Sequence, residues 1–180
     1  MKTGFFGKRD AKSIFKKPEP NGVSKHDEYG HSHKGVAVCK KCHNVLFKKE
    51  WHRPGVQLSD QILLARKKGV HFVLCPACMM ITNKQYEGEV IIKNVPEKYE
   101  VELVNLIASY NERAQKRDPQ DRVIVIEKNK KGYRVTTTEN QLAVRLAKKI
   151  RSAFSRGRVA LHISHSAEPY EVERVVLTFK

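Results

Sequence analysis

The 180-residue chain contains no long hydrophobic run, few acidic residues and a single tryptophan. No stretch approaches the ~18 to 20 consecutive apolar residues that a membrane-spanning helix needs. The start, from Met1 to Arg9, also lacks the ~7 to 15-residue apolar segment of a secretory signal. We therefore expect a soluble protein of the cytoplasm.

The motifs of several enzyme classes are missing as well. The sequence has no G-x-x-x-x-G-K-[ST], no G-x-G-x-x-G after a strand, no H-E-x-x-H and no G-x-S-x-G. His162 and His165 alternate on a predicted strand, but no carboxylate accompanies them for acid–base catalysis. We therefore expect a non-enzymatic protein. An enzyme of nucleic-acid processing with its site near these two histidines is kept as an alternative hypothesis.

Positive charge greatly exceeds negative charge. The chain has 35 Lys and Arg against 19 Asp and Glu, a formal net charge of +16. Such an excess indicates a polyanionic partner, which could be nucleic acid, the ribosome or an anionic membrane surface. The excess is densest in residues 39–84, with nine basic and two acidic side chains.

Residues 1–35 are rich in Gly, Lys, His, Ser and Pro and have no sustained hydrophobic period, which predicts a disordered basic tail. Phe5 and Phe6 are interleaved with cations there, a mixture that can stack on bases while neutralising phosphates. A tail that only keeps the protein soluble is the alternative. The predicted RNA-binding cations of the tail are Lys8, Arg9, Lys16 and Lys17.

The four cysteines form two C-x-x-C pairs, Cys39 with Cys42 and Cys75 with Cys78. In a reducing compartment such pairs indicate metal thiolates rather than disulfides. Four cysteine ligands make the closed tetrahedron of a structural zinc site and leave no position open for catalysis. We expect Zn²⁺ in a zinc-ribbon-like module over residues 36–84. Iron–sulfur or rubredoxin-like iron and thiol redox chemistry are the alternatives.

The spacing predicts a helix from Leu58 to Lys68, between the two cysteine pairs. Cations gather around the cysteines with Trp51 among them, an arrangement that suits phosphate backbones and unstacked bases. A core-filling role is the alternative for Trp51. The predicted RNA-binding residues of this module are Lys40, Lys41, Lys48, Lys49, Arg53, Arg66, Lys67 and Lys68.

Residues 85–180 form the segment that is long enough for a regular core. Its hydrophobic periods predict the order β-α-β-β-α-β-β, an α+β sandwich with two helices on one face of an antiparallel or mixed sheet. Residues 122–126 and 133–138 are expected to pair as a hairpin. Thr138, followed three residues later by Gln141, predicts a capping box at the start of the second helix.

The second predicted helix has a basic face opposite the apolar face of Leu142, Leu146 and Ile150. An ordinary solvated helix surface is the alternative to RNA binding there. The predicted RNA-binding residues of this face are Arg145, Lys148, Lys149 and Arg156.

The two C-x-x-C pairs, followed by an α+β segment with Val135 to Thr138 before a basic helix, resemble a family of short bacterial zinc-ribbon proteins. That family is similar to the N-terminal part of the large-ribosomal-subunit export adaptor named for nonsense-mediated mRNA decay. The resemblance covers roughly residues 36–180 and implies a ribosome-binding zinc module joined to an α+β domain. The adaptor has more C-x-x-C pairs, so nuclear export does not carry over.

These observations predict a ribosome-associated zinc protein that binds large-subunit rRNA, with no membrane and no small-molecule substrate as partner. Such a protein could block an idle large subunit, as a hibernation or stress factor does, and so regulate translation. The second hypothesis is a zinc-ribbon adaptor or regulator that binds a protein partner, with the charge serving solubility.

Overall fold

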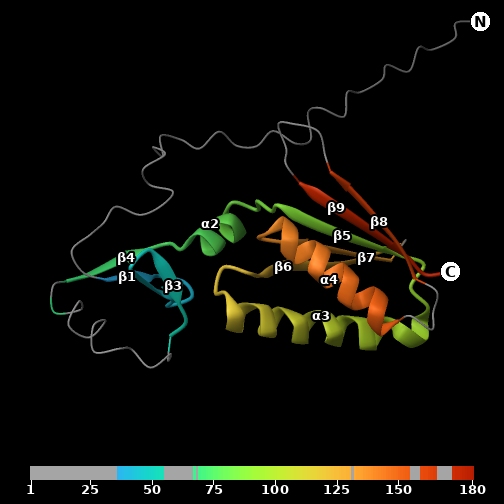
Figure 1. Ribbon diagram of the computed structural model, residues 1–180, viewed down its shortest axis with the longest axis horizontal. Coiled ribbons are helices and arrows are strands. Elements are labelled where there is room, and N and C mark those ends of the chain that lie inside the picture. The colour runs from blue at the N-terminus through green and yellow to red at the C-terminus, as the bar shows by residue number, and fades with distance from the viewer. Residues whose placement is uncertain (1–35, 55–66, 68, 131, 155–158, 166–171) are drawn as a thin grey trace, which may run out of the picture. The chain divides into compact units, whose positions relative to one another are not determined.

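The computed structural model describes residues 36–54, 67, 69–130, 132–154, 159–165 and 172–180 (Figure 1). By its contacts the chain divides into Met1–His31 and Ser32–Lys180, and every described residue belongs to the second unit. The predicted basic tail, nearly all of the predicted helix at 58–68, and Arg156 lie outside the described residues.

The first sheet carries the cysteines at one end of its strands. Its strand order is β3-β2-β1-β4, with β1 and β4 parallel and the other pairs antiparallel. The short helix α2 follows β4, and the second C-x-x-C pair lies at its start, with Cys75 as the N-cap and Cys78 in the helix. The elements are β1 (Val36–Cys39), β2 (Val45–Phe47), β3 (Glu50–His52), β4 (Val70–Val73) and α2 (Pro76–Thr82).

The second sheet has five strands in the order β6-β7-β5-β9-β8, and two long helices accompany it. The central pair β5 and β9 is parallel, whereas β6 and β7 form the antiparallel hairpin that the sequence predicts. The α+β class is thus confirmed, with two mixed sheets. The elements are β5 (Gly88–Lys93), α3 (Glu97–Arg117), β6 (Val123–Asn129), β7 (Gly132–Thr137), α4 (Asn140–Ala153), β8 (Ala160–His165) and β9 (Glu173–Thr178).

One apolar core joins the second sheet to its helices. The residues spaced at three and four in each helix are the ones buried, including Leu103 and Ile107 of α3 and Leu146 of α4. From the sheet they meet Val90 and Ile92, which alternate inward along β5. The helical and strand periods of the sequence therefore predict this core correctly.

The predicted capping box is wrong. Helix α4 has Glu139 at its N-cap, with no capping bond from that side chain. The Thr138 hydroxyl instead donates to the backbone oxygen of Gln120 at 2.6 Å and accepts the backbone N–H of Arg122 at 2.9 Å. Thr138 is used to hold the chain that leaves α3, so it is not available to α4.

Candidate metal centre

The four cysteines come together in one cluster. Their Sγ atoms all lie within 4.8 Å of one another, and those of Cys42 and Cys75 are 3.6 Å apart. A disulfide would need about 2.05 Å, and all four cysteines are free. For a tetrahedral ion bonded to sulfur at about 2.3 Å, neighbouring sulfurs lie about 3.8 Å apart. The cluster therefore fits a metal ion bound by four thiolates.

The first C-x-x-C pair lies on the turn between β1 and β2. The Cys39 N–H donates to the Asn44 oxygen at 2.8 Å, and the His43 N–H donates back to the Cys39 oxygen at 3.0 Å. His43 adopts a positive φ of 60°, which closes the turn. The Lys40 N–H donates to the Val73 oxygen at 2.8 Å, which ties this turn to the end of β4.

The second pair begins helix α2. Cys75 is the N-cap, and its sulfur accepts the N–H of Cys78 at 3.4 Å. Pro76 occupies the first turn, where a missing N–H costs nothing. The Cys75 N–H in turn donates to the sulfur of Cys39 at 3.4 Å. Backbone N–H groups thus face two of the four sulfurs.

Burial and hydrogen bonding shift the pKa values of the thiols in different directions. Burial raises the pKa of Cys39, but backbone hydrogen bonds from Cys42, Cys75 and Lys41 outweigh it and lower the value to about 6. Burial raises the pKa of Cys75 and of Cys78 above the ordinary thiol range. A metal ion would replace the remaining thiol protons, so binding is coupled to proton release.

A residue that was not predicted from the sequence, Arg122, reaches this cluster from just before β6. Arg122 directs Nη1 at the sulfur of Cys78 at 3.4 Å and Nη2 at that of Cys75 at 4.0 Å. Burial lowers the pKa of Arg122, yet hydrogen bonding and attraction to the cysteine sulfurs hold it above its ordinary value. No sequence motif marks this arginine, because its position depends on how the chain leaves α3.

Trp51 lies on β3 and packs, half-buried, against the cysteine cluster together with Leu74. This placement favours the core-filling alternative over stacking on a base. Strand β3 was not expected from the sequence. Phe5 and Phe6, the other predicted stacking residues, lie outside the described residues.

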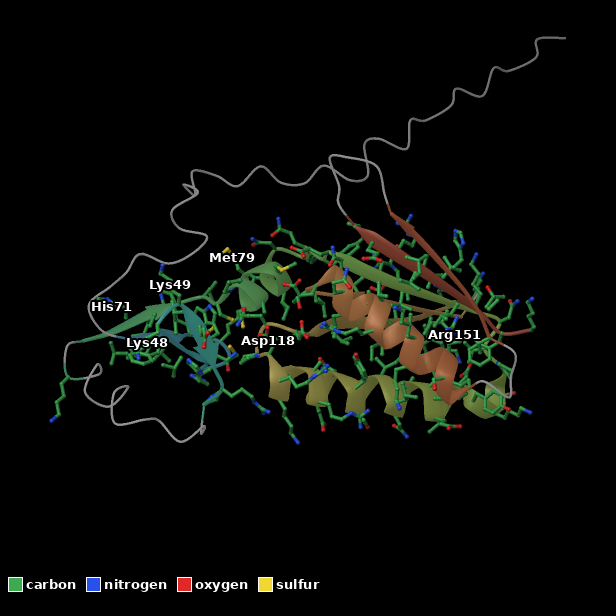
Figure 2. All side chains as sticks on the ribbon, in the orientation of Figure 1. Lys48, Lys49, His71, Met79, Asp118 and Arg151 are labelled. Carbon is green, nitrogen blue, oxygen red and sulfur yellow. The ribbon has the colours of Figure 1, made fainter. Side chains whose placement is uncertain are left out.

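The predicted RNA-binding cations of the module lie on several turns of the first sheet, of which the turn with Lys40 and Lys41 is the one between two cysteines. Lys40 and Lys41 are exposed between the first two cysteines, and Lys41 Nζ donates to the Thr82 hydroxyl at 2.9 Å. Lys48 and Lys49, labelled in Figure 2, form the turn between β2 and β3. Lys67 is exposed and Arg53 is half-exposed, whereas Arg66 and Lys68 lie outside the described residues.

The basic face of α4 is only partly available. Lys148 and Lys149 are exposed, whereas Leu146 and Ile150 of the same helix are buried. Arg145, however, forms an ion pair with Asp121, Nη2 to Oδ2 at 2.7 Å. The carboxylate comes from outside the helix, just before β6.

His162 is exposed on β8, opposite Val176 of β9, and His165 ends the same strand. Among the described residues, the four cysteines are the one cluster of three or more His, Cys, Asp or Glu side chains that could hold a metal ion. None of the described helices is long and apolar enough to cross a membrane.

No family model matches the chain, and no curated protein does. The geometry of the cysteine cluster and the charge around it therefore carry the functional argument.

Proposed function

We propose that this chain is a ribosome-associated zinc protein that binds large-subunit rRNA and catalyses no reaction. Zinc is the proposed metal because it favours closed tetrahedral sites made of cysteine thiolates. Cys39, Cys75 and Cys78 are buried, which leaves little room for a substrate at the ion. Four protein ligands also leave no open coordination position, so the ion would be structural.

The observation that carries the proposal is that the cysteine cluster lies in the most basic segment of the chain, with the exposed Lys40 and Lys41 on the turn that contains the first pair. A metal-held turn would fix the backbone of Lys40 and Lys41, which lie between the first pair of ligands. Fixed cations bind phosphates with little loss of conformational entropy. A module that is rigid, basic and non-catalytic has the properties expected for rRNA binding.

Helix α4 supplies a second basic surface. Lys148 and Lys149 are both exposed on this helix. Together with the tail, these surfaces would bind many phosphates, and binding should weaken steeply with salt. A factor that occupies idle large subunits in this way would act in hibernation or stress.

The test is co-sedimentation of the zinc-loaded full chain with purified ribosomes across a series of salt concentrations. Lys148→Gln with Lys149→Gln should weaken binding and reduce the salt slope by about one for each phosphate that is no longer neutralised. The matched control is Lys116→Gln with Arg117→Gln, which removes the same charge from exposed positions on α3. Absence of binding at low salt, or equal weakening in both variants, would contradict the proposal.

A protein-binding adaptor is the second candidate, and one observation favours it. Strand β4 is at the edge of its sheet, and Phe72 and Val70 on it are 64% and 41% exposed. An exposed apolar edge strand can pair with a strand of another protein. Cross-linking after nuclease treatment separates the two candidates, because adducts that contain only protein and disappear in Phe72→Ser would favour the adaptor.

A further inference from the structure

The connection from α3 to β6 (residues 118–122) lies against the cysteine cluster. The Ala77 N–H, in the first turn of α2, donates to Oε1 of Gln120 at 3.0 Å. Two residues later, the Arg122 guanidinium contacts the sulfurs of Cys78 and Cys75. Figure 2 labels Asp118, where the connection begins, and Met79 on α2. The connection between α3 and β6 thus contributes two side chains to the surroundings of the cysteines.

Arg122 is fixed in position by its own neighbours. Its Nε donates to the Pro119 oxygen at 2.9 Å, which sets the plane of the guanidinium. Its backbone N–H donates to the Thr138 hydroxyl, which itself donates to the Gln120 oxygen. The connection is therefore held between the end of β7 and the start of α2. A guanidinium held in this way loses little entropy when it meets a charged partner.

The charge expected at the metal centre would be compensated by this arginine. Four thiolates around a divalent ion carry a net charge of about −2, and burial of such charge is costly unless cations or hydrogen-bond donors compensate it. Lys41, next to Cys42 in the chain, directs its ammonium to Thr82 rather than to a sulfur. Arg122 offers both a positive charge and N–H donors to Cys75 and Cys78.

We infer that Arg122 is a positioning residue of the metal centre, whose guanidinium compensates the thiolate charge of Cys75 and Cys78 and thereby strengthens metal binding. This inference rests on the proposed zinc centre but not on RNA binding. It makes metal affinity depend on a residue more than forty positions from the cysteines it contacts. Residues of this kind around a metal typically change its affinity by about 10- to 100-fold when they are replaced.

The experiment measures zinc affinity of the full chain by competition with a chromophoric chelator. Arg122→Gln should lower the affinity about 10- to 100-fold. Arg122→Lys, which keeps the charge but removes the forked donor, should fall between wild type and Arg122→Gln. Arg117→Gln removes an exposed arginine from the end of α3 and should match wild type. Melting temperatures of the zinc-loaded and metal-free proteins are recorded in parallel.

The melting temperatures separate a role toward the metal from a purely structural one. Arg122→Gln should reduce the stabilisation that zinc provides, which is the difference between loaded and metal-free protein. An affinity within about twofold of wild type, or an equal loss of stability with and without zinc, overturns the inference. If Arg122→Gln does not fold, a several-fold loss of affinity in Arg122→Lys supports the role and wild-type affinity there overturns it. A wild type that retains no zinc overturns the zinc centre as well.

Discussion

At the scale of single residues, the turn between β2 and β3 has an unfavourable backbone. Lys48 and Lys49 have φ values of 50° and 70°, in the left-handed region that Asn and Gly favour. A left-handed conformation costs residues such as lysine roughly 1 to 2 kcal/mol each. Strain of this kind is typical of functional sites. Under the proposed function, phosphate binding by the two lysines explains this strain, whereas the turn alone does not.

This explanation predicts opposite effects on stability and binding. Replacing the turn by Lys48→Asn with Lys49→Gly should stabilise the zinc-loaded protein by about 1 kcal/mol, because Asn-Gly suits two left-handed positions. The variant also removes the cation–π interaction of Lys48 with Phe47, which offsets part of this gain. The same variant should bind ribosomes more weakly, with a smaller salt slope. Thermal unfolding and co-sedimentation check the two halves, and a variant that binds as tightly as wild type would contradict the assignment.

At the scale of elements, one buried carboxylate joins three strands. The Glu89 carboxylate of β5 accepts a hydrogen bond from Nε of Arg134 on β7 at 2.6 Å. It accepts another from Nε of Arg174 on β9. Arg134 further contacts Glu127 of β6 at 3.1 Å and lies over the ring of Tyr86. Burial raises the pKa of Glu89, but the two arginines outweigh it and hold the pKa below its ordinary value of 4.5.

The lowered pKa of Glu89 fixes the sign of a pH effect. A carboxyl whose pKa is depressed by folding contributes stability above its unfolded pKa and loses that contribution as the pH falls through the folded pKa. Glu89→Gln should therefore cost about 2 kcal/mol at pH 7, and the gap to wild type should narrow below pH 4.5. Urea unfolding of both proteins at pH 7, 5 and 3 measures the gap, and loss of zinc at low pH affects both alike.

Glu127→Gln is the control for this element. Its side chain is 54% exposed and contacts the same Arg134, so its removal should change stability much less at every pH. A gap for Glu89→Gln that widens below pH 4.5 would show that Glu89 does not act as its contacts indicate.

The elements were largely predictable because their patterns are local. The spacing of Leu103, Ile107, Leu142 and Leu146 identifies both long helices, and the apolar run at 123–126 identifies a strand. Helix α2 was not predicted from the sequence, although Pro76 is typical of a helix start.

The site was predictable only as far as its residues are close in sequence. The C-x-x-C spacing places Cys39 with Cys42 and Cys75 with Cys78, and the cluster confirms that the two pairs meet. The contact of Arg122 with Cys78 and the ion pair of Arg145 with Asp121 could not be predicted. Both join residues more than twenty positions apart and depend on the tertiary structure. Neither interaction has a periodic or motif signal in the sequence.

At the scale of the whole molecule, the two sheets have different sources of stability. The second sheet shares a continuous apolar core with α3 and α4, built on large side chains such as Ile92, Leu146 and Leu177. Around the first sheet, the buried described residues form two small groups, one of which consists of three cysteines and Ala77. A metal ion bound by the four cysteines would therefore take the place of an apolar core there, and its binding would contribute folding free energy directly.

Removal of zinc from the intact chain should accordingly unfold one part and spare the other. Amide hydrogen exchange after treatment with a strong chelator should show loss of protection in β1, β4 and α2, because the ion that holds their cysteines together is gone. The connection at 118–122 should also lose protection, because Gln120 and Arg122 would lose their hydrogen bonds to Ala77 and Cys78 when α2 unfolds. The amides of α4 and β5 should stay protected by their apolar core. Cys75→Ser without chelator should reproduce this pattern, and either uniform loss or uniform retention of protection would refute the division of stability between the sheets.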